Sequence, residues 1–236
     1  MAHEAIADAK TSKSFASVMA ALLILTTLVE VLAIWHHPHV QSYDLLQATF
    51  EVIAGSHLAG WIHGLAIGCS LLVAYCLGEL LRNRMPAPLL RAAALVYVAG
   101  IASWITAATV DGWVLERLAA SLRHDTPSDL ESNTRLFKLC MAWVVASTNV
   151  GVVLTSIGIF VASGGLLRNG RSWQIAGIVG LLVGAALSFS ILAGRLSMDG
   201  HGIRVLVGLQ SIWFITVGVV SLNDSRQFQT RTGAAA

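Results

Sequence analysis

Hydrophobic residues dominate the chain in six long stretches, and polar residues are concentrated in the short connections between them. A bilayer core is about 30 Å thick, so a helix that rises about 1.5 Å per residue needs roughly 20 apolar residues to cross it. Each stretch reaches that length. The pattern therefore predicts six transmembrane helices, at residues 15–35, 57–81, 92–113, 139–161, 173–193 and 203–222.

The stretches are continuously apolar, whereas the strands of a membrane barrel are shorter and alternate between apolar and polar residues. The predicted fold is therefore all-α, a polytopic membrane helix bundle that forms one domain over residues 1–236. Composition agrees with a protein surrounded by lipid: 56% of the residues are hydrophobic and 12% are charged, with a mean hydropathy of +0.71. Little of the chain remains for a separate soluble domain.

Two of the predicted outer connections show helical periodicity of their own. In residues 42–53, Leu46, Phe50 and Ile53 are spaced to share one helix face, and residues 113–122 place Leu115 and Leu118 on another. This spacing predicts short amphipathic outer helices that lie on the membrane surface. The polar residues 124–133 are expected to form a loop.

Lysine and arginine in short loops indicate orientation, because cytoplasmic loops carry more of them. Nine would lie on the side of the two tails, residues 1–13 and 223–236, and six on the other side. Both tails are therefore expected to be cytoplasmic. The nine are Lys10, Lys13, Arg82, Arg84, Arg91, Arg168, Arg171, Arg226 and Arg231, and the six are Arg117, Arg123, Arg135, Lys138, Arg195 and Arg204.

Small residues recur at every fourth position on two of the predicted spans, a pattern that lets helix backbones approach closely. We therefore expect the second and fifth spans to lie in the crowded centre of the bundle. The residues are Ser56, Gly60, Gly64 and Gly68 on the second span and Gly180, Gly184 and Ser188 on the fifth.

Residues 78–83 and 164–169 are similar in sequence, and each lies at the end of a predicted span before a short basic turn. The similarity fits either a duplicated pair of helices or two ordinary basic turns.

Histidines supply the main chemical lead, because seven of the eight fall on the predicted outer side. Imidazole is the commonest metal ligand in proteins and also binds haem iron. The candidate metal ligands are His57, His63 and His201, or a histidine of the tract at 36–39 in place of His201. The seven are His36, His37, His39, His57, His63, His124 and His201.

Three further polar residues are candidates for a pocket beside these histidines: Glu30, Asp111 and Asn149. Ionisable groups inside a membrane are energetically costly, which marks Glu30 and His63 as functional candidates, paired with each other or facing a water-filled pocket. The competing interpretation is a hydrogen-bonded polar cluster with a purely structural role.

The sequence leaves three classes of function open: a redox site on the outer side that binds a metal or haem, a small transporter or channel, and an accessory subunit of a membrane complex. Expected partners are the lipid bilayer and a membrane protein or a second copy of the chain. We expect no nucleic acid, because the basic residues are anchors beside the membrane. The sequence contains none of the phosphate-binding, serine-nucleophile or HExxH zinc motifs, and it does not decide whether the protein is an enzyme.

Two resemblances bear on these classes. Residues 50–58 resemble the outer glutamate and helix-capping histidine of haem A synthases, but they differ in spacing and lack the arginine that follows the histidine. In layout, the whole chain resembles an uncharacterised family of bacterial six-span membrane proteins. That layout consists of basic turns after Leu80-Leu81-Arg82 and Leu166-Leu167-Arg168 and a polar outer loop near Thr126. The second resemblance implies a bacterial inner-membrane protein and transfers no functional residues.

Overall fold

The computed structural model describes the backbone of residues 2–37, 45–121, 127–196 and 200–233, and side chains within 14–37, 58–121, 131–196 and 202–225 together with residue 129. The described backbone contains no strand. Its elements are α1 (Ala2–Trp35), α2 (Leu45–Leu81), α3 (Ala87–Thr109), the π-helical turn η1 (Val110–Val114), α4 (Leu115–Ser121), α5 (Pro127–Leu166), α6 (Arg171–Leu192) and α7 (Gly200–Gly233).

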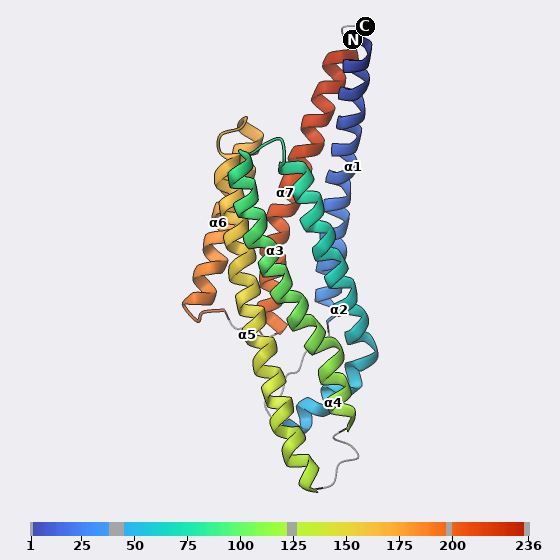
Figure 1. Cartoon of the computed structure of the whole chain (residues 1–236), viewed down its shortest axis with the longest axis vertical. Helices are drawn as coiled ribbons and strands as arrows, with labels where there is room; N and C mark the ends of the chain where they lie inside the picture. Colours follow the sequence, from blue (N-terminus) through green and yellow to red (C-terminus); the bar gives the residue numbers. More distant parts are fainter. Residues whose placement is uncertain (1, 38–44, 122–126, 197–199, 234–236) are drawn as a thin grey trace.

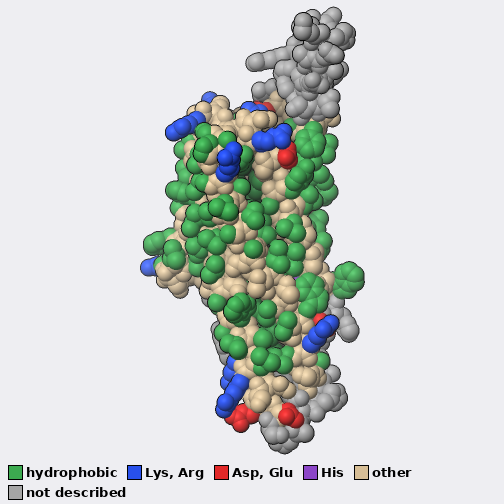
Figure 2. Space-filling model, in the orientation of Figure 1, with side chains coloured by type: hydrophobic (Ala, Val, Ile, Leu, Met, Phe, Trp, Pro, Cys, Tyr) green, Lys and Arg blue, Asp and Glu red, His purple; other side chains and the backbone are tan. Residues whose placement is uncertain are grey.

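Six of these helical segments are long and apolar enough to cross a membrane, which confirms the predicted fold class. Figure 2 shows hydrophobic side chains covering the middle of the visible face, with charged side chains mainly toward the ends. Leu95, Leu182 and Phe189 are among the large apolar side chains that remain exposed. The spans are Ser14–Trp35, Leu58–Leu81, Ala87–Ser121, Glu131–Leu166, Arg171–Leu192 and Gly202–Ser225.

The six long helices form a closed ring in which chain neighbours pack side by side. Going round the ring, α1 contacts α2, α2 contacts α3, α3 contacts α5, α5 contacts α6, and α6 contacts α7, which returns to α1. Helix α1 begins and α7 ends at the same end of the molecule, which we call the termini end (Figure 1). The prediction that the second and fifth spans are central is wrong, because their helices, α2 and α6, are members of the ring like the others.

At the opposite end, α5 and the α3–α4 segment extend well beyond the end of α6 (Figure 1). The predicted loop at 124–133 is wrong from residue 127 onward, because α5 begins at Pro127. Proline at the first helical position followed by an acidic residue in the first turn is a common helix start, so Pro127 and Asp129, which suggested a turn, begin a helix here.

The two predicted outer helices are both helical where the structure describes them, but neither stands alone. Residues 45–53 are the first turns of a continuous α2. Helix α4 follows η1 directly, and its Leu115 and Ala119 are buried against Phe137 of α5. The apolar face of α4 therefore packs on a neighbouring helix rather than only on lipid.

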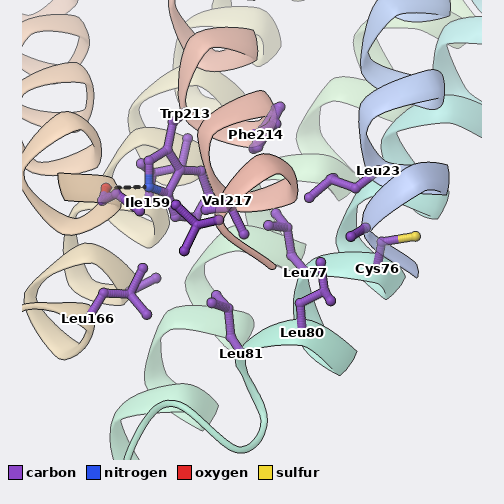
Figure 3. Packing of buried hydrophobic residues seen from close by; sticks show 14 of the residues in the cluster. Leu23, Cys76, Leu77, Leu80, Leu81, Ile159, Leu166, Trp213, Phe214 and Val217 are labelled. Carbon is purple, nitrogen blue, oxygen red and sulfur yellow. Dashed lines mark hydrogen bonds between the residues drawn. The ribbon is translucent and has the colours of Figure 1, made fainter. Parts of the chain in front are cut away.

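The main core lies toward the termini end and is filled by large side chains from several helices (Figure 3). Trp213 of α7 is almost fully buried, and its indole Nε1 donates a hydrogen bond to the carbonyl oxygen of Ala176 at 3.1 Å. An unpaired indole N–H would be costly in this surrounding, so the bond allows a tryptophan to fill the core. Leu23, Cys76 and Val217 pack in the same cluster.

Glycines let some of the helices approach closely, but the glycines of α2 that the sequence pattern singled out do not face another helix backbone at the closest crossing. Gly60 and Gly64 face the indole of Trp113, and Gly68 has open space beside it. The tight crossing is between α3 and α5, where a Cβ on Gly100 would lie 2.7 Å from the backbone nitrogen of Thr155. On α6, a Cβ on Gly184 would lie 2.6 Å from the carbonyl oxygen of Ser156, so the small-residue pattern there does mark a close contact.

A polar cluster holds three segments together at the termini end. Asp224 of α7 accepts a hydrogen bond from the indole Nε1 of Trp173 at 2.6 Å and pairs with Arg84 at 3.0 Å. The Arg84 guanidinium also lies 4.9 Å from the centre of the Trp173 ring. Asn169 adds a hydrogen bond to the carbonyl oxygen of Arg84 at 2.8 Å. Asp224 thus ties the α2–α3 turn and the start of α6 to α7.

Replacing Asp224 with alanine should lower the stability of the detergent-purified protein by about 1–3 kcal/mol, because both the Trp173 indole and the Arg84 guanidinium lose their partner. Thermal unfolding followed by circular dichroism measures the effect. Glu131→Ala is the matched control, since its ion pair with Arg135 is mostly exposed and should contribute little. Equal unfolding temperatures for the two variants would contradict the role of Asp224.

Candidate metal centre

Three segments of the chain bring two imidazoles and a carboxylate together where the spans Ser14–Trp35 and Leu58–Leu81 reach the side away from the termini end. His37 follows the end of α1, His63 lies in the first turns of the second span, and Asp111 lies in η1. Each residue offers one potential ligand atom, and these three atoms all lie within 4.8 Å of one another. The cluster joins groups that are far apart in the sequence.

The distances among the three atoms are close to those of ligands around one small ion. His63 Nε2 lies 3.0 Å from Asp111 Oδ2 and 3.1 Å from His37 Nε2, and His37 Nε2 lies 3.8 Å from Asp111 Oδ2. Zinc binds such atoms at about 2.0–2.2 Å, so two ligands at a tetrahedral angle lie about 3.3 Å apart. Small side-chain adjustments would place all three around one ion.

The orientation of His63 is set by its other ring nitrogen. Nδ1 lies 2.7 Å from the carbonyl oxygen of Ala59, one turn earlier in α2. A carbonyl oxygen can only accept, so Nδ1 carries a proton and donates it. In a neutral imidazole the proton on Nδ1 leaves Nε2 with a lone pair, and this lone pair faces Asp111 and His37. Such a hydrogen bond from the second nitrogen to a backbone carbonyl is typical of metal-binding histidines.

Two lone pairs facing each other at 3.0 Å are repulsive, so a positive charge is needed between His63 and Asp111. A second proton on His63 would provide it and make an ion pair of imidazolium and carboxylate. A metal cation would also provide it, and would be held by His37 as well. The geometry thus defines two alternatives, a structural ion pair and a metal site.

Asp111, Gly112 and Trp113 each contact this part of α2. Asp111 contacts His63, and Gly112 is buried where a Cβ would come within 2.9 Å of the Cβ and Cγ of His63. Trp113 covers Gly60 and Gly64. These three residues lie in the π-helical turn, a form of helix that is rare and frequent at functional sites.

The three side chains differ in exposure in a way that leaves the cluster accessible. The relative exposure is 10% for the His63 side chain, 19% for His37 and 32% for Asp111. The imidazoles of His37 and His63 meet edge to face, with ring centres 4.7 Å apart. A partly exposed carboxylate beside a buried imidazole gives an ion or a small molecule a route to the cluster.

The sequence candidates are distributed unevenly around this cluster. His63 and Asp111 belong to it, and His37 comes from the tract at 36–39. The side chains of His57 and His201 lie outside the described residues. Glu30 lines a separate cavity, where its carboxyl group accepts a hydrogen bond from Ser70 at 2.9 Å. Asn149 is partly buried on α5 and belongs to neither this cluster nor that cavity.

The sequence predicts Asp111 beside the histidines without pairing it with His63 in particular, although two features of the sequence point to a contact there. An acidic residue at the end of an apolar span, followed directly by glycine, indicates a close approach of another helix. Position in a histidine tract does not by itself identify a metal ligand. The exposed side chain of His36, next to His37, bonds to the carbonyl oxygen of Leu32 within its own helix.

Haem ligation by the pair His37 and His63 does not fit the geometry. Axial ligands lie on opposite faces of the haem, so at bonds of about 2 Å their nitrogen atoms are roughly 4 Å apart with the iron between them. The two Nε2 atoms are 3.1 Å apart and both face Asp111. This arrangement suits ligands on one side of a single ion.

Comparison with known proteins does not extend this picture. No protein family model, curated protein or solved structure matches the chain. The layout resemblance to a bacterial membrane family is therefore supported only as far as six long apolar helices.

Gly112→Ala should displace His63 and lower stability by about 1–3 kcal/mol, because the new methyl group overlaps the imidazole. Thermal unfolding measures the loss. Gly68→Ala is the control on α2, since its Cβ would meet nothing within 4 Å. A Gly112→Ala protein as stable as Gly68→Ala would show that η1 and α2 are less close than the structure has them.

Proposed function

We propose that the protein is a multi-pass membrane protein that binds one divalent transition metal ion through His37, His63 and Asp111. The observation that carries the proposal is the convergence of three ligand atoms within 4.8 Å, with the His63 lone pair directed into the cluster by the hydrogen bond to Ala59. A metal removes the repulsion between His63 and Asp111 and can take the nearby Nε2 atom of His37 as a third ligand.

The ligand set favours particular metals. Imidazole suits zinc, copper, iron and nickel, and a carboxylate in place of a thiolate disfavours soft Cu(I). Two histidines and one carboxylate form the ligand set of non-haem iron sites with open positions and resemble the three-ligand sets of catalytic zinc. Three protein ligands leave at least one position for water or a substrate. The partly exposed side of Asp111 is where such a molecule would enter.

The chemistry of the site depends on which metal it holds. Zinc has no redox chemistry and would act as a Lewis acid or activate a bound water, whereas iron would support the redox role suggested by the sequence. Support for a transporter is weaker, because the proposed polar lining separates into the metal cluster and a distinct cavity, and Asn149 joins neither.

Detergent-purified protein, stripped with a chelator and titrated with Zn²⁺, should bind one equivalent by calorimetry, and elemental analysis of protein purified without chelator should identify the native metal. His63→Ala and Asp111→Ala should each weaken Zn²⁺ binding at least 10-fold, because each removes one of three ligands and an orienting contact. Absorption spectra of the same samples report any iron or haem.

His36→Ala is the matched control, because His36 is the neighbour of His37 in the chain but bonds only within its own helix turn in the described contacts. It should bind Zn²⁺ like the wild type. A wild-type protein that neither contains metal nor gains thermal stability from added Zn²⁺ would leave His63 and Asp111 as a structural ion pair.

We further propose that the protein lies in a bacterial inner membrane with both tails in the cytoplasm, so that the metal site faces outward. The support is the distribution of charge: Arg82, Arg84 and Arg91 flank the α2–α3 turn, and Arg168 and Arg171 flank the α5–α6 turn, both at the termini end. Positive charge in short loops favours the cytoplasmic side.

Reporter fusions test this orientation. An alkaline phosphatase joined after Arg84 should be inactive, because it stays in the cytoplasm, and one joined after His124 should be active. Green fluorescent protein at the same two positions should give the reverse pattern. The same side reported at both positions would contradict the spans, and the opposite pattern would reverse the proposed orientation.

A further inference from the structure

A second polar site lies inside the helix ring and shares no residue with the metal cluster. A cavity of about 20 Å³ is bordered by five of the six ring helices, α1, α2, α3, α5 and α7. The lining side chains that carry a hydroxyl, carboxyl or amide group are Glu30, Ser70, Tyr97, Thr155, Gln210 and Ser211. A volume of this size exceeds the roughly 10–15 Å³ that one water molecule requires.

The cavity lies deep within the predicted membrane region. Ser70 is near the middle of the span Leu58–Leu81, and its hydroxyl donates a hydrogen bond to Glu30 Oε1 at 2.9 Å. On the other side of the lining, Gln210 donates a hydrogen bond to the Thr155 hydroxyl at 3.0 Å, and that hydroxyl bonds to the carbonyl oxygen of Val152. Carboxyl, hydroxyl and amide groups therefore surround one small space.

No positively charged side chain lines this cavity in the part of the chain that the structure describes. The thiol of Cys69 on α2 and the phenol of Tyr97 on α3 are close enough to interact with a charge on Glu30, and both are neutral in their ordinary protonated forms. Thr155 of α5 and Gln210 of α7 contribute no charge. An ionised carboxylate here would lack a counter-ion in a region of low dielectric, which is costly.

We propose that Glu30 is a proton-binding site inside the bundle, and that it exchanges its proton with solvent through water in this cavity. The un-ionised carboxyl accepts from Ser70 through one oxygen and can donate its own proton to a cavity water. Gln210 and Thr155 give that water further polar partners, within the two to four that buried waters usually have. The ligand is a proton, and the site works whether or not the His37 cluster binds metal.

Infrared difference spectroscopy of the whole protein in lipid tests the proposal without needing a reagent to enter the cavity. The wild type minus Glu30→Gln spectrum at neutral pH should contain the carbonyl stretch of an un-ionised carboxylic acid. The band should shift in D₂O, which shows exchange with solvent, and should disappear as pH is raised. Glu79→Gln, which removes a carboxylate paired with Arg82 near the end of α2, should leave the band unchanged.

Ser70→Ala provides a second variant in case Glu30→Gln does not fold. It keeps the carboxyl but removes the hydrogen bond to Oε1, so the band should remain and move in frequency. Absence of the band from the wild type, or a band that never responds to D₂O, would overturn the proposal. Loss of the band on adding Na⁺ at constant pH would also overturn it and assign the cavity to an alkali cation.

Discussion

The requirement that every backbone amide inside a bilayer find a partner within the protein determines the form of this molecule. Lipid offers no hydrogen-bonding groups, so a chain with six apolar stretches must cross as helices that satisfy their own backbone. Once the backbone is satisfied, the helices associate by close packing rather than by escape from water. The tight crossing of α3 and α5 at Gly100 follows from that condition, as does the hydrogen bond that Trp213 makes with Ala176.

The same requirement applies to polar side chains and explains their grouping. Ser70 within a span has no bulk water to bond to, and its hydroxyl donates to Glu30 instead. His63 satisfies Nδ1 within its own helix and reaches across to Asp111 with Nε2. At the termini end, Asp224 serves Trp173 and Arg84 together. Each cluster joins neighbouring or facing segments of the ring, so the interactions that satisfy these groups also fix how the helices meet.

Sequence reasoning recovered the number, type and approximate position of the spans, because hydropathy over about 20 residues is a strong and local signal. It failed at residues 127–133, where Pro127 and the acidic residues after it suit a turn and a helix start equally well. It included Asp111 and the histidine tract at 36–39 among the candidate partners of His63, but it could not select them over the other candidates. Helical-wheel geometry assumes a regular α-helix, and the π-helical turn at Asp111 departs from that regularity without a recognisable sequence pattern.

The two polar sites place different demands on the same pair of helices. Helix α1 carries Glu30 and leads to His37, and α2 carries both Ser70 and His63. A metal bound by His37 and His63 would fix the end of α1 against the middle of α2. A proton on Glu30 would let the same two helices pack around the Glu30 carboxyl, farther inside the membrane, without a counter-ion. A shift of α1 against α2 would therefore disturb both sites, although they have no residue in common. This shared framework gives a physical reason for the close packing of the ring around them.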